Sequence, residues 1–240
     1  LIETDHHWEF VDEQISTDNL NPETEVLSVF ITSAVTAEII NALPKLRLIA
    51  CRSTGFNNID LNAAAAKGIA VENVPTYGDQ TVAEYAFTLL LALSRKLPEA
   101  INSYDKNVPV ENMRGWDLKG KTLGVIGSGH IGQCAIKIAN GFGMNVIAFD
   151  PYPNEQVADE LGFKYVELDE IFINSDAITI HAPYFPSNHH IVNAEKLALM
   201  KPTAVLVNTA RGELVDTKAL ADAMSQNKIA GVALDVIEGE

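Results

Sequence analysis

The sequence has few basic residues and few cysteines. It carries 17 lysines and arginines against 32 aspartates and glutamates, a formal net charge of −15, and only five of the basic residues are arginines. Nucleic-acid binding depends on basic faces that neutralise phosphates, so this balance argues against nucleic acid as a partner. Cys51 and Cys134 have no CxxC spacing and lie in apolar patterns. They indicate core residues in a reducing compartment, and we expect a cytoplasmic protein.

Long apolar runs are also missing. The longest, "AFTLLLAL", has about half the length needed to cross a bilayer, so we expect no membrane partner. The first residues, "LIETDHHWEF", contain no basic leader, no signal-peptide core and no initial Met. We therefore expect the N-terminus to be a boundary of the sequence as given. A chain of 240 residues that is 47% hydrophobic can form one large domain or two modest ones.

Short apolar runs alternate with helical segments in the first third of the chain. Strands are predicted at 26–32, 46–51 and 69–73, with helices at 36–43 and after Asp60. Apolar runs too short for helices, separated by helical segments, indicate parallel strands covered on both faces. We expect residues 1–77 to form a smaller α/β domain.

A long apolar helix is predicted at 81–97, and a polar connector follows at 107–120. A helix that is apolar on most sides packs between domains or against a second subunit. We therefore expect a homodimer, with Leu89, Leu90 and Leu93 on the helix face that meets the partner.

From Lys121 onward the alternation of strands and helices becomes stronger. The predicted strands are 122–126, 144–149, 176–180, 203–207 and 229–235, and the predicted helices are 131–140, 155–161, 193–199 and 216–226. This pattern is typical of a doubly wound parallel sheet. We expect a doubly wound domain of the Rossmann type over residues 78–240.

Three glycines mark the first turn of this domain. Gly127, Gly129 and Gly132 have the G-x-G-x-x-G spacing between a predicted strand and a predicted helix. The first permits a tight turn, the second lets the backbone approach a pyrophosphate, and the third allows close packing of the helix on the sheet. The helix N-terminus offers N–H groups and a partial positive charge to the phosphates. A tight turn without a ligand is the alternative.

Asp150 stands at the end of the next predicted strand. A carboxylate there can accept hydrogen bonds from the adenosine ribose hydroxyls and would repel a 2′-phosphate. No Arg follows in "DPYPNEQ" to bind such a phosphate. The pattern predicts NAD rather than NADP as the cofactor.

Arg211 follows the predicted strand 203–207, at the edge of the sheet where ligands of such folds bind. Arginine is planar, always charged and able to bind a carboxylate through two parallel hydrogen bonds. A surface arginine that caps a strand end is the alternative, but the scarcity of arginine in this chain favours function.

Seven segments occur in an order that resembles a known family. They are "RSTGFNNIDL", "NVPTYGDQTVAEYA", "GVIGSGHIG", "AFDPYP", "HAPYFPSNHH", "NTARGELVD" and "GVALDVIEGE". The chain resembles the NAD-dependent D-isomer-specific 2-hydroxyacid dehydrogenases over nearly its whole length. The resemblance implies that residues 1–77 are part of a flavodoxin-like substrate domain and that residues 78–240 form the NAD-binding Rossmann domain. Through "GFNNIDL" and "GFGMNVIAFDPYP" it is most similar to the fermentative D-lactate dehydrogenases within that family.

The resemblance implies roles for single residues. Arg211 would bind the substrate carboxylate and polarise the carbonyl, and Glu240 would hold the catalytic histidine in its protonated form. Backbone N–H groups near Thr54 and Gly55 would cradle the carboxylate, and Tyr77 would point into the same pocket. The cofactor contacts implied are His130, Ile131 and Asp150 at the phosphates and ribose, Ala182, Pro183 and Asn188 on the adenine side, and Thr209, Ala210 and Asp235 near the nicotinamide.

The histidine that would pair with Glu240 is not found among the six in this chain, all of which precede Arg211. In the family it follows the acid, so we expect the sequence to be incomplete at both ends. His181 is the substitute within the chain, although the resemblance places it beside the cofactor. The adjacent pair His189 and His190 lacks a visible third ligand, so no metal site is predicted.

The implied reaction is hydride transfer from NADH to a 2-keto acid, with pyruvate and D-lactate as the favoured pair. Glyoxylate, hydroxypyruvate, a branched 2-keto acid and phosphite are the alternative substrates within the same class. A protein that senses NAD without catalysis, like the corepressors that share this fold, is the alternative from another class. A purely structural α/β domain would leave the glycine turn, Asp150 and Arg211 unexplained.

Overall fold

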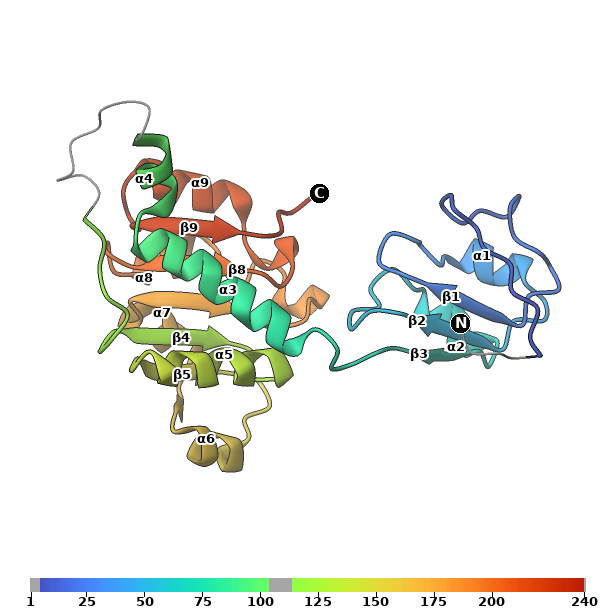
Figure 1. Ribbon diagram of the computed structural model, residues 1–240, viewed down its shortest axis with the longest axis horizontal. Helices are drawn as coiled ribbons and strands as arrows, with labels where there is room; N and C mark the ends of the chain where they lie inside the picture. Colours follow the sequence, from blue (N-terminus) through green and yellow to red (C-terminus); the bar gives the residue numbers. More distant parts are fainter. Residues whose placement is uncertain (1–4, 104–113, 240) are drawn as a thin grey trace. The chain divides into compact units, whose positions relative to one another are not determined.

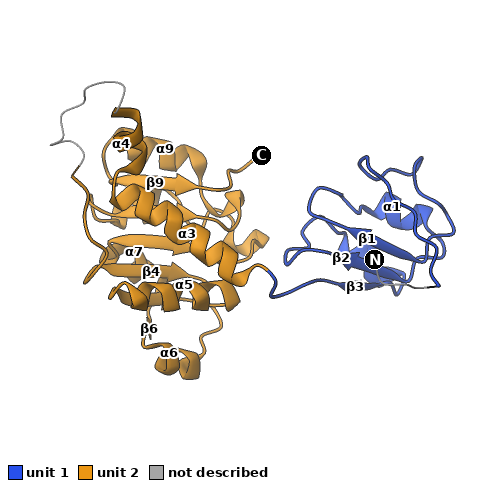
Figure 2. Ribbon diagram, viewed as in Figure 1, with its two compact units in different colours: residues 1–77 blue, residues 78–240 orange. Residues whose placement is uncertain are grey.

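The computed structural model describes residues 5–103 and 114–239. The chain divides into two compact units, Leu1–Tyr77 and Gly78–Glu240, here called unit 1 and unit 2 (Figure 2). Of the sequence predictions, part of the connector (107–113) and Glu240 lie outside the described residues. Each unit is described by itself.

Unit 1 is a small parallel sheet with two short helices. Its strands β1 (Val26–Val29), β2 (Leu48–Cys51) and β3 (Ala70–Glu72) lie side by side in that order, and its helices are α1 (Ala37–Ala42) and α2 (Leu61–Ala66). Both helices begin at a residue whose side chain caps the first turn, as Thr36 accepts from Ile39 N and Asp60 from Ala63 N. The sheet and helices enclose one apolar core.

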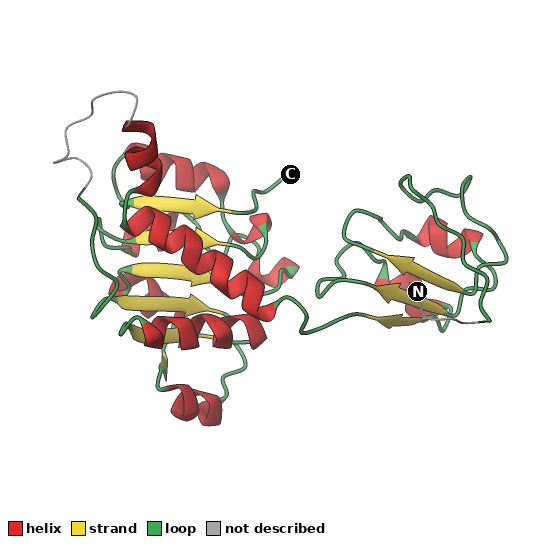
Figure 3. Ribbon diagram, in the orientation of Figure 1, coloured by secondary structure: helices red, strands yellow, loops and turns green. Residues whose placement is uncertain are grey.

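Unit 2 is the larger α/β unit (Figures 1 and 3). Its strands are β4 (Thr122–Ile126), β5 (Asn145–Phe149), β6 (Lys164–Tyr165), β7 (Ala177–Ile180), β8 (Val205–Asn208) and β9 (Gly231–Leu234). Its helices are α3 (Asp79–Ser94), α4 (Leu97–Ser103), α5 (His130–Gly141), α6 (Glu155–Leu161), α7 (Leu168–Asn174), α8 (Ala194–Leu199) and α9 (Thr217–Ser225), with the short 3₁₀ turns η2 (Pro186–Asn188) and η3 (Gly212–Leu214).

The six strands of unit 2 are parallel and lie in the order β6-β5-β4-β7-β8-β9. This is the Rossmann order, in which the direction of winding reverses between the first strand and the fourth, here β4 and β7. The predicted α/β class and doubly wound sheet are confirmed. Because all strands run the same way, the turns after β4, β5, β7, β8 and β9 meet at one edge of the sheet.

Helices cover both faces of this sheet. Leu123 and Val125 of β4 pack into a core shared with α3 and α5, whereas Ile126 packs into a second core shared with α7, α8 and α9. Figure 1 shows α3 and α5 across the same face. Strands buried on both faces explain why the sequence shows continuous apolar runs rather than alternation.

Two predictions about helices differ from the structure. Helix α3 ends at Ser94 because Lys96 adopts a left-handed backbone (φ 50°), and the separate helix α4 begins at Leu97. Leu90, predicted on a partner-facing surface, is 2% exposed and lies in the core of its own unit. Helix α7 was not predicted, since Glu167 rather than Ser or Thr forms the capping box with Glu170 that begins it.

Among the described residues, the helices are too short or too polar to cross a lipid bilayer.

Candidate active site

The turn between β4 and α5 requires glycine for steric reasons. Gly127 has a φ of +94°, and a Cβ there would lie 2.7 Å from the backbone nitrogen of Ala182. A Cβ at Gly132 would lie 2.1 Å from the carbonyl oxygen of Gly127. The turn is therefore folded tightly between the first turn of α5 and the end of β7, and side chains at these two positions would push the three segments apart.

Gly129 differs from the other two glycines because a Cβ there would meet nothing within 4 Å of the described residues. It is the N-cap of the 12-residue helix α5, and no side chain of the described residues caps that end. The first N–H groups of a helix have no partners within the helix. The turn thus leaves open space in front of a bare helix N-terminus, which begins with His130 and Ile131.

His130 lies beside a residue that the sequence analysis did not single out. Its Nδ1 is 3.9 Å from Oδ2 of Asp79, the first residue of α3. Oδ1 of Asp79 is buried and has no hydrogen-bond partner among the described residues. Asp79 lies in the segment "NVPTYGDQTVAEYA", which carries part of the family resemblance. Only the fold shows that the N-termini of α3 and α5 are neighbours.

Asp150 is held in place by hydrogen bonds. Its Oδ2 accepts from the backbone N (2.8 Å) and the Oγ (3.0 Å) of Ser128, and its Oδ1 accepts from Tyr152 N (2.9 Å). Ser128 Oγ also lies 2.8 Å from the hydroxyl of Tyr165 on β6. The middle residue of the glycine turn thus fixes the carboxylate that follows β5, and sequence reasoning missed both Ser128 and Tyr165.

The loop after β7 carries Ala182 and Pro183 and is closed by Asn188. The Asn188 Nδ2 donates to Pro183 O (2.8 Å), and its Oδ1 accepts from Phe185 N (2.7 Å). Asn188 therefore shapes the loop through both ends of its side-chain amide.

His181, at the end of β7, is 8% exposed, and its Nε2 lies 3.0 Å from Thr179 Oγ1. Burial lowers the pKa of the His181 imidazole to about 4, because the charged form would lose its hydration. The ring is neutral near pH 7, which is unsuitable for a proton donor at that pH.

The turn after β8 is held by a buried asparagine. Asn208 Nδ2 donates to Arg211 O (2.8 Å), and its Oδ1 accepts from Ala210 N (3.0 Å). Thr209 within this turn is buried, and its Oγ1 has no hydrogen-bond partner in the described part of the chain. Asp235 joins the same corner because its N donates to Asn208 O (2.9 Å).

Gly212 brings a further segment against this turn. A Cβ at Gly212 would lie 2.2 Å from the carbonyl carbon of Ile237 and 2.3 Å from the nitrogen of Glu238. The backbone that follows β9 therefore passes directly over the residue next to Arg211. Gly212 was not predicted, and its role is visible only where two distant segments cross.

The three residues predicted to bind substrate are in unit 1. Thr54 and Gly55 follow β2 in a turn held by hydrogen bonds from Ser53 Oγ to Gly55 O (2.8 Å) and from Asn73 Nδ2 to Thr54 O (2.8 Å). Tyr77 is the last residue of the unit, and 59% of it is exposed. In unit 2 the predicted cofactor residues and Arg211 follow the carboxyl ends of parallel strands, at one edge of the sheet.

Comparison with known proteins identifies the family of the chain. Residues 87–240 match the NAD binding domain of the D-isomer specific 2-hydroxyacid dehydrogenases. The chain belongs to this family. The matched domain is an NAD binding domain, and unit 2 forms a Rossmann sheet, so the predicted family, fold and cofactor are confirmed.

The chain is similar in sequence to several known members of this family. It is 41% identical over 228 residues to a 2-hydroxyacid dehydrogenase homolog of Haemophilus influenzae, a match that covers 94% of this chain and 69% of the relative. It is 39% identical over 219 residues to the D-lactate dehydrogenase of Escherichia coli, covering 90% of this chain and 66% of that protein. Others, at 42% and 38% identity, are named D-3-phosphoglycerate dehydrogenase and glyoxylate reductase.

Among solved structures, the chain is similar to the D-lactate dehydrogenase of Aquifex aeolicus complexed with NAD and lactic acid. The TM-score is 0.87 at 37% identity, and the match covers 94% of this chain and 68% of that one.

The residues at the sheet edge of unit 2 fit NAD. The open space at Gly129 and the bare N-terminus of α5 suit a pyrophosphate, and the fixed carboxylate of Asp150 suits two ribose hydroxyls. The unpartnered Oγ1 of Thr209 supplies a polar group at the far end of the same edge. Bound there, NADH would be a hydride donor.

Proposed function

We propose that this chain reduces a 2-keto acid to the D-2-hydroxy acid with NADH, and that the favoured pair is pyruvate and D-lactate. The observation that carries the proposal is the position of Arg211. It lies three residues beyond the end of the buried strand β8, at the same sheet edge as the glycine turn and Asp150. A cation at that edge would hold an anionic substrate where a dinucleotide also binds.

Arg211 binds the substrate carboxylate in this proposal through two parallel hydrogen bonds, which its planar guanidinium permits. Asn208 donates a hydrogen bond to the backbone carbonyl of Arg211, and Arg211 Nη1 donates to Ala210 O (2.7 Å). These contacts fix the turn that carries the arginine side chain. Gly212 supports the same turn from the other side because only glycine lets the 237–238 backbone pass so closely.

Reduction of the keto group also needs a proton at the carbonyl oxygen. We assign it to a histidine paired with Glu240, as the resemblance implies, since a carboxylate beside an imidazole keeps the acid form available. His181 is not that donor, because burial lowers its pKa to about 4. Asn208 and Gly212 are positioning residues in this scheme, and they act through Arg211.

We assign the two units different parts. Unit 2 holds NAD, and unit 1 contributes the turn at Thr54 and Gly55, together with Tyr77, to substrate binding. The support for the second assignment is the pinned turn at the end of β2, whose backbone conformation is set by Ser53 and Asn73. The two cysteines are free, which suits a reducing compartment such as the cytoplasm.

The experiment that tests this function uses the protein expressed from its complete gene and measures NADH oxidation with pyruvate, glyoxylate, hydroxypyruvate and a branched 2-keto acid. Product from pyruvate is then assayed with enzymes specific for D- or L-lactate. We expect the highest kcat/KM with pyruvate and a product that is D-lactate. A preference for glyoxylate would retain the class and change the substrate, as in relatives with that name.

Arg211→Lys provides the matched control because it keeps the charge and loses the bidentate geometry. The kcat/KM of Arg211→Lys should fall by about ten- to a hundredfold, because a charge-assisted hydrogen bond of about 1.5–3 kcal/mol is lost. The affinity for NADH should be unchanged. NADH binding without oxidation by any keto acid would overturn the proposal in favour of a protein that senses NAD.

A further inference from the structure

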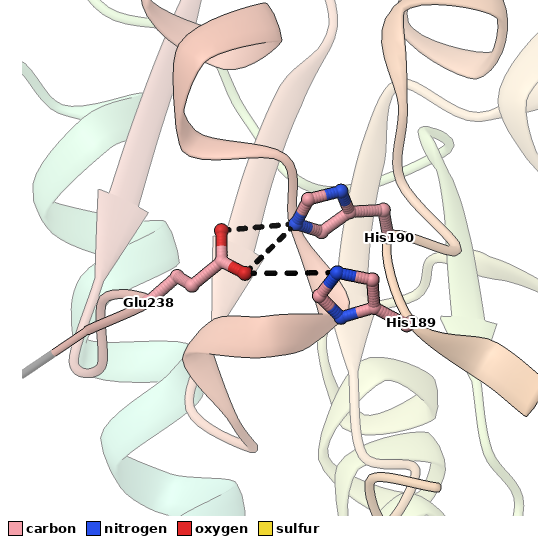
Figure 4. Close-up of side chains that lie close together, drawn as sticks. All are labelled: His189, His190 and Glu238. Carbon is pink, nitrogen blue, oxygen red and sulfur yellow. Dashed lines mark hydrogen bonds and ion pairs between the residues drawn. The ribbon is translucent and has the colours of Figure 1, made fainter. Parts of the chain in front are cut away.

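Two histidines and one glutamate meet where the loop after β7 lies against the segment that follows β9. The ligand atoms of His189, His190 and Glu238 all lie within 4.8 Å of one another (Figure 4). Over the described residues, this is the only group of three or more histidine, cysteine or carboxylate side chains that comes so close together.

The backbone at His190 explains how two adjacent side chains reach the same point. Neighbouring residues in extended chain point to opposite sides, but His190 has a left-handed conformation with a φ of 53°. The two imidazole rings are therefore stacked, with centroids 3.8 Å apart and planes 23° apart. Both Nε2 atoms face the Glu238 carboxylate in Figure 4.

An ion pair between His190 and Glu238 accounts for only two of the three side chains. His190 Nε2 lies 3.0 Å and 2.9 Å from the two carboxylate oxygens, which is hydrogen-bond distance. His189 Nε2 lies 3.8 Å from Oε1, which is too long for a hydrogen bond. A cation between the three atoms would give both imidazoles and the carboxylate one shared partner.

Each ligand is held by packing outside the group. The backbone N of His190 donates to Glu213 O (2.9 Å), and the backbone N of Val192 donates to Leu214 O (3.0 Å). These two hydrogen bonds fix the loop to η3. The Glu238 backbone is pressed against Gly212, as described above. The ring of Tyr184 meets His189 edge-on at 6.0 Å between centroids.

We propose that His189, His190 and Glu238 form a binding site for a divalent transition-metal ion of the zinc type. Two imidazole nitrogens and one carboxylate oxygen suit Zn²⁺, and three protein ligands leave a fourth tetrahedral position for water. Mg²⁺ and Ca²⁺ prefer sites made of oxygen atoms alone. The side chains of His189, His190 and Glu238 are 43%, 29% and 32% exposed, so an ion can enter from solvent.

The acidic character of the chain also favours cations near its surface, since the formal net charge is −15. The sequence analysis predicted no metal site because it saw only two adjacent histidines. The third ligand lies 48 residues further along, and the fold alone brings it to the pair.

The test measures Zn²⁺ binding by calorimetry on protein first treated with a chelator, and the visible absorption of bound Co²⁺ as a second readout. We expect one ion per chain and the bands of tetrahedral Co²⁺. His189→Ala and Glu238→Gln should each weaken Zn²⁺ binding by more than roughly tenfold, because each removes a ligand itself rather than a residue that orients a ligand. Circular dichroism checks that both variants are folded.

The chain offers a matched control in a second adjacent histidine pair. His7 Nε2 lies 3.4 Å from Glu9 Oε1 in that pair, and its side chain is 85% exposed. Replacing His6 and His7 together by Ala should leave Zn²⁺ affinity unchanged. Equal affinity in wild type and His189→Ala, or loss of binding in the His6/His7 variant alone, would overturn the proposal. His189→Ala suffices for this decision if Glu238→Gln does not fold.

Discussion

Asp150 depends on two residues that lie far from it in the sequence. Ser128, 22 residues before it, donates two hydrogen bonds to one of its carboxylate oxygens, and Tyr165 holds the Ser128 hydroxyl. A carboxylate fixed in this way is already oriented when a ribose arrives, which reduces the entropy lost on binding. In the role that we propose for Asp150, the same fixed charge would repel the 2′-phosphate that distinguishes NADPH.

Asp150→Ala tests this selectivity. The variant loses hydrogen bonds to the ribose and the repulsion of a 2′-phosphate, so the ratio of NADPH to NADH dissociation constants should fall by about tenfold or more. Fluorescence titration of both cofactors measures the ratio. Tyr165→Phe should shift it less, and Asp159→Ala on the exposed side of α6 should leave it as in the wild type. An unchanged ratio in Asp150→Ala would refute the assigned role.

His181 is a buried base whose proton affinity is set by its surroundings. Its pKa falls from 6.5 to about 4 because the folded protein excludes water from the ring. The unfolded chain therefore binds a proton between these pH values and the folded chain does not. The stability associated with the neutral ring is fully present above pH 6.5 and is lost as the pH falls toward 4.

The corresponding measurement is urea denaturation at pH 7 and pH 5. Wild type should lose about 2 kcal/mol more unfolding free energy over this interval than His181→Asn, which cannot titrate. Carboxylates contribute to both proteins alike and cancel in the difference. Identical losses in the two proteins would mean that His181 is protonated in the folded state.

At the scale of elements, helix α5 is placed by the glycine turn. Its sequence predicted both the helix and the turn, and the observed bounds of His130–Gly141 lie within one residue of the predicted 131–140. The close approach of the helix to the turn is a property of the packed elements. It follows from the 2.1 Å that would separate a Cβ at Gly132 from Gly127 O.

Two glycines of α5 provide a paired test of this packing. Gly132→Ala should destabilise unit 2 by about 1–3 kcal/mol and weaken NADH binding, since the helix must move away from the turn. Gly141→Ala meets nothing within 4 Å of the described residues and should stabilise by about 0.5–1 kcal/mol through lower chain entropy. Thermal unfolding with and without NADH measures both effects. Equal behaviour of the two variants would contradict the packing argument.

At the scale of the whole molecule, we propose a homodimer through the exposed side of α3. Leu90 is in the core of unit 2, so substitutions there would unfold the protein rather than separate subunits. Tyr85 is 44% exposed on the same helix and is the better probe. Aromatic residues are enriched in protein interfaces, so Tyr85 suits the centre of a symmetric contact between two copies of α3.

Sedimentation of Tyr85→Glu tests the dimer. We expect the wild type at twice the chain mass and the variant near the mass of one chain, because the glutamate would place a charge in the contact. Tyr152→Glu, at a position that is 88% exposed in the same unit, should remain a dimer. A wild type at the mass of one chain, or a variant at twice that mass, would remove α3 from the interface.

The sequence by itself determined the alternation of strands and helices, the glycine turn, Asp150 and Arg211, since each depends on residues within a few positions of one another. Only the tertiary structure decided which distant side chains meet. Ser128 joins Tyr165 across 37 residues, and His190 joins Glu238 across 48. Such contacts depend on the order of the strands in the sheet and on the paths of the loops. Periodicity predicts the class of sheet, but it does not predict which side chains the loops bring together.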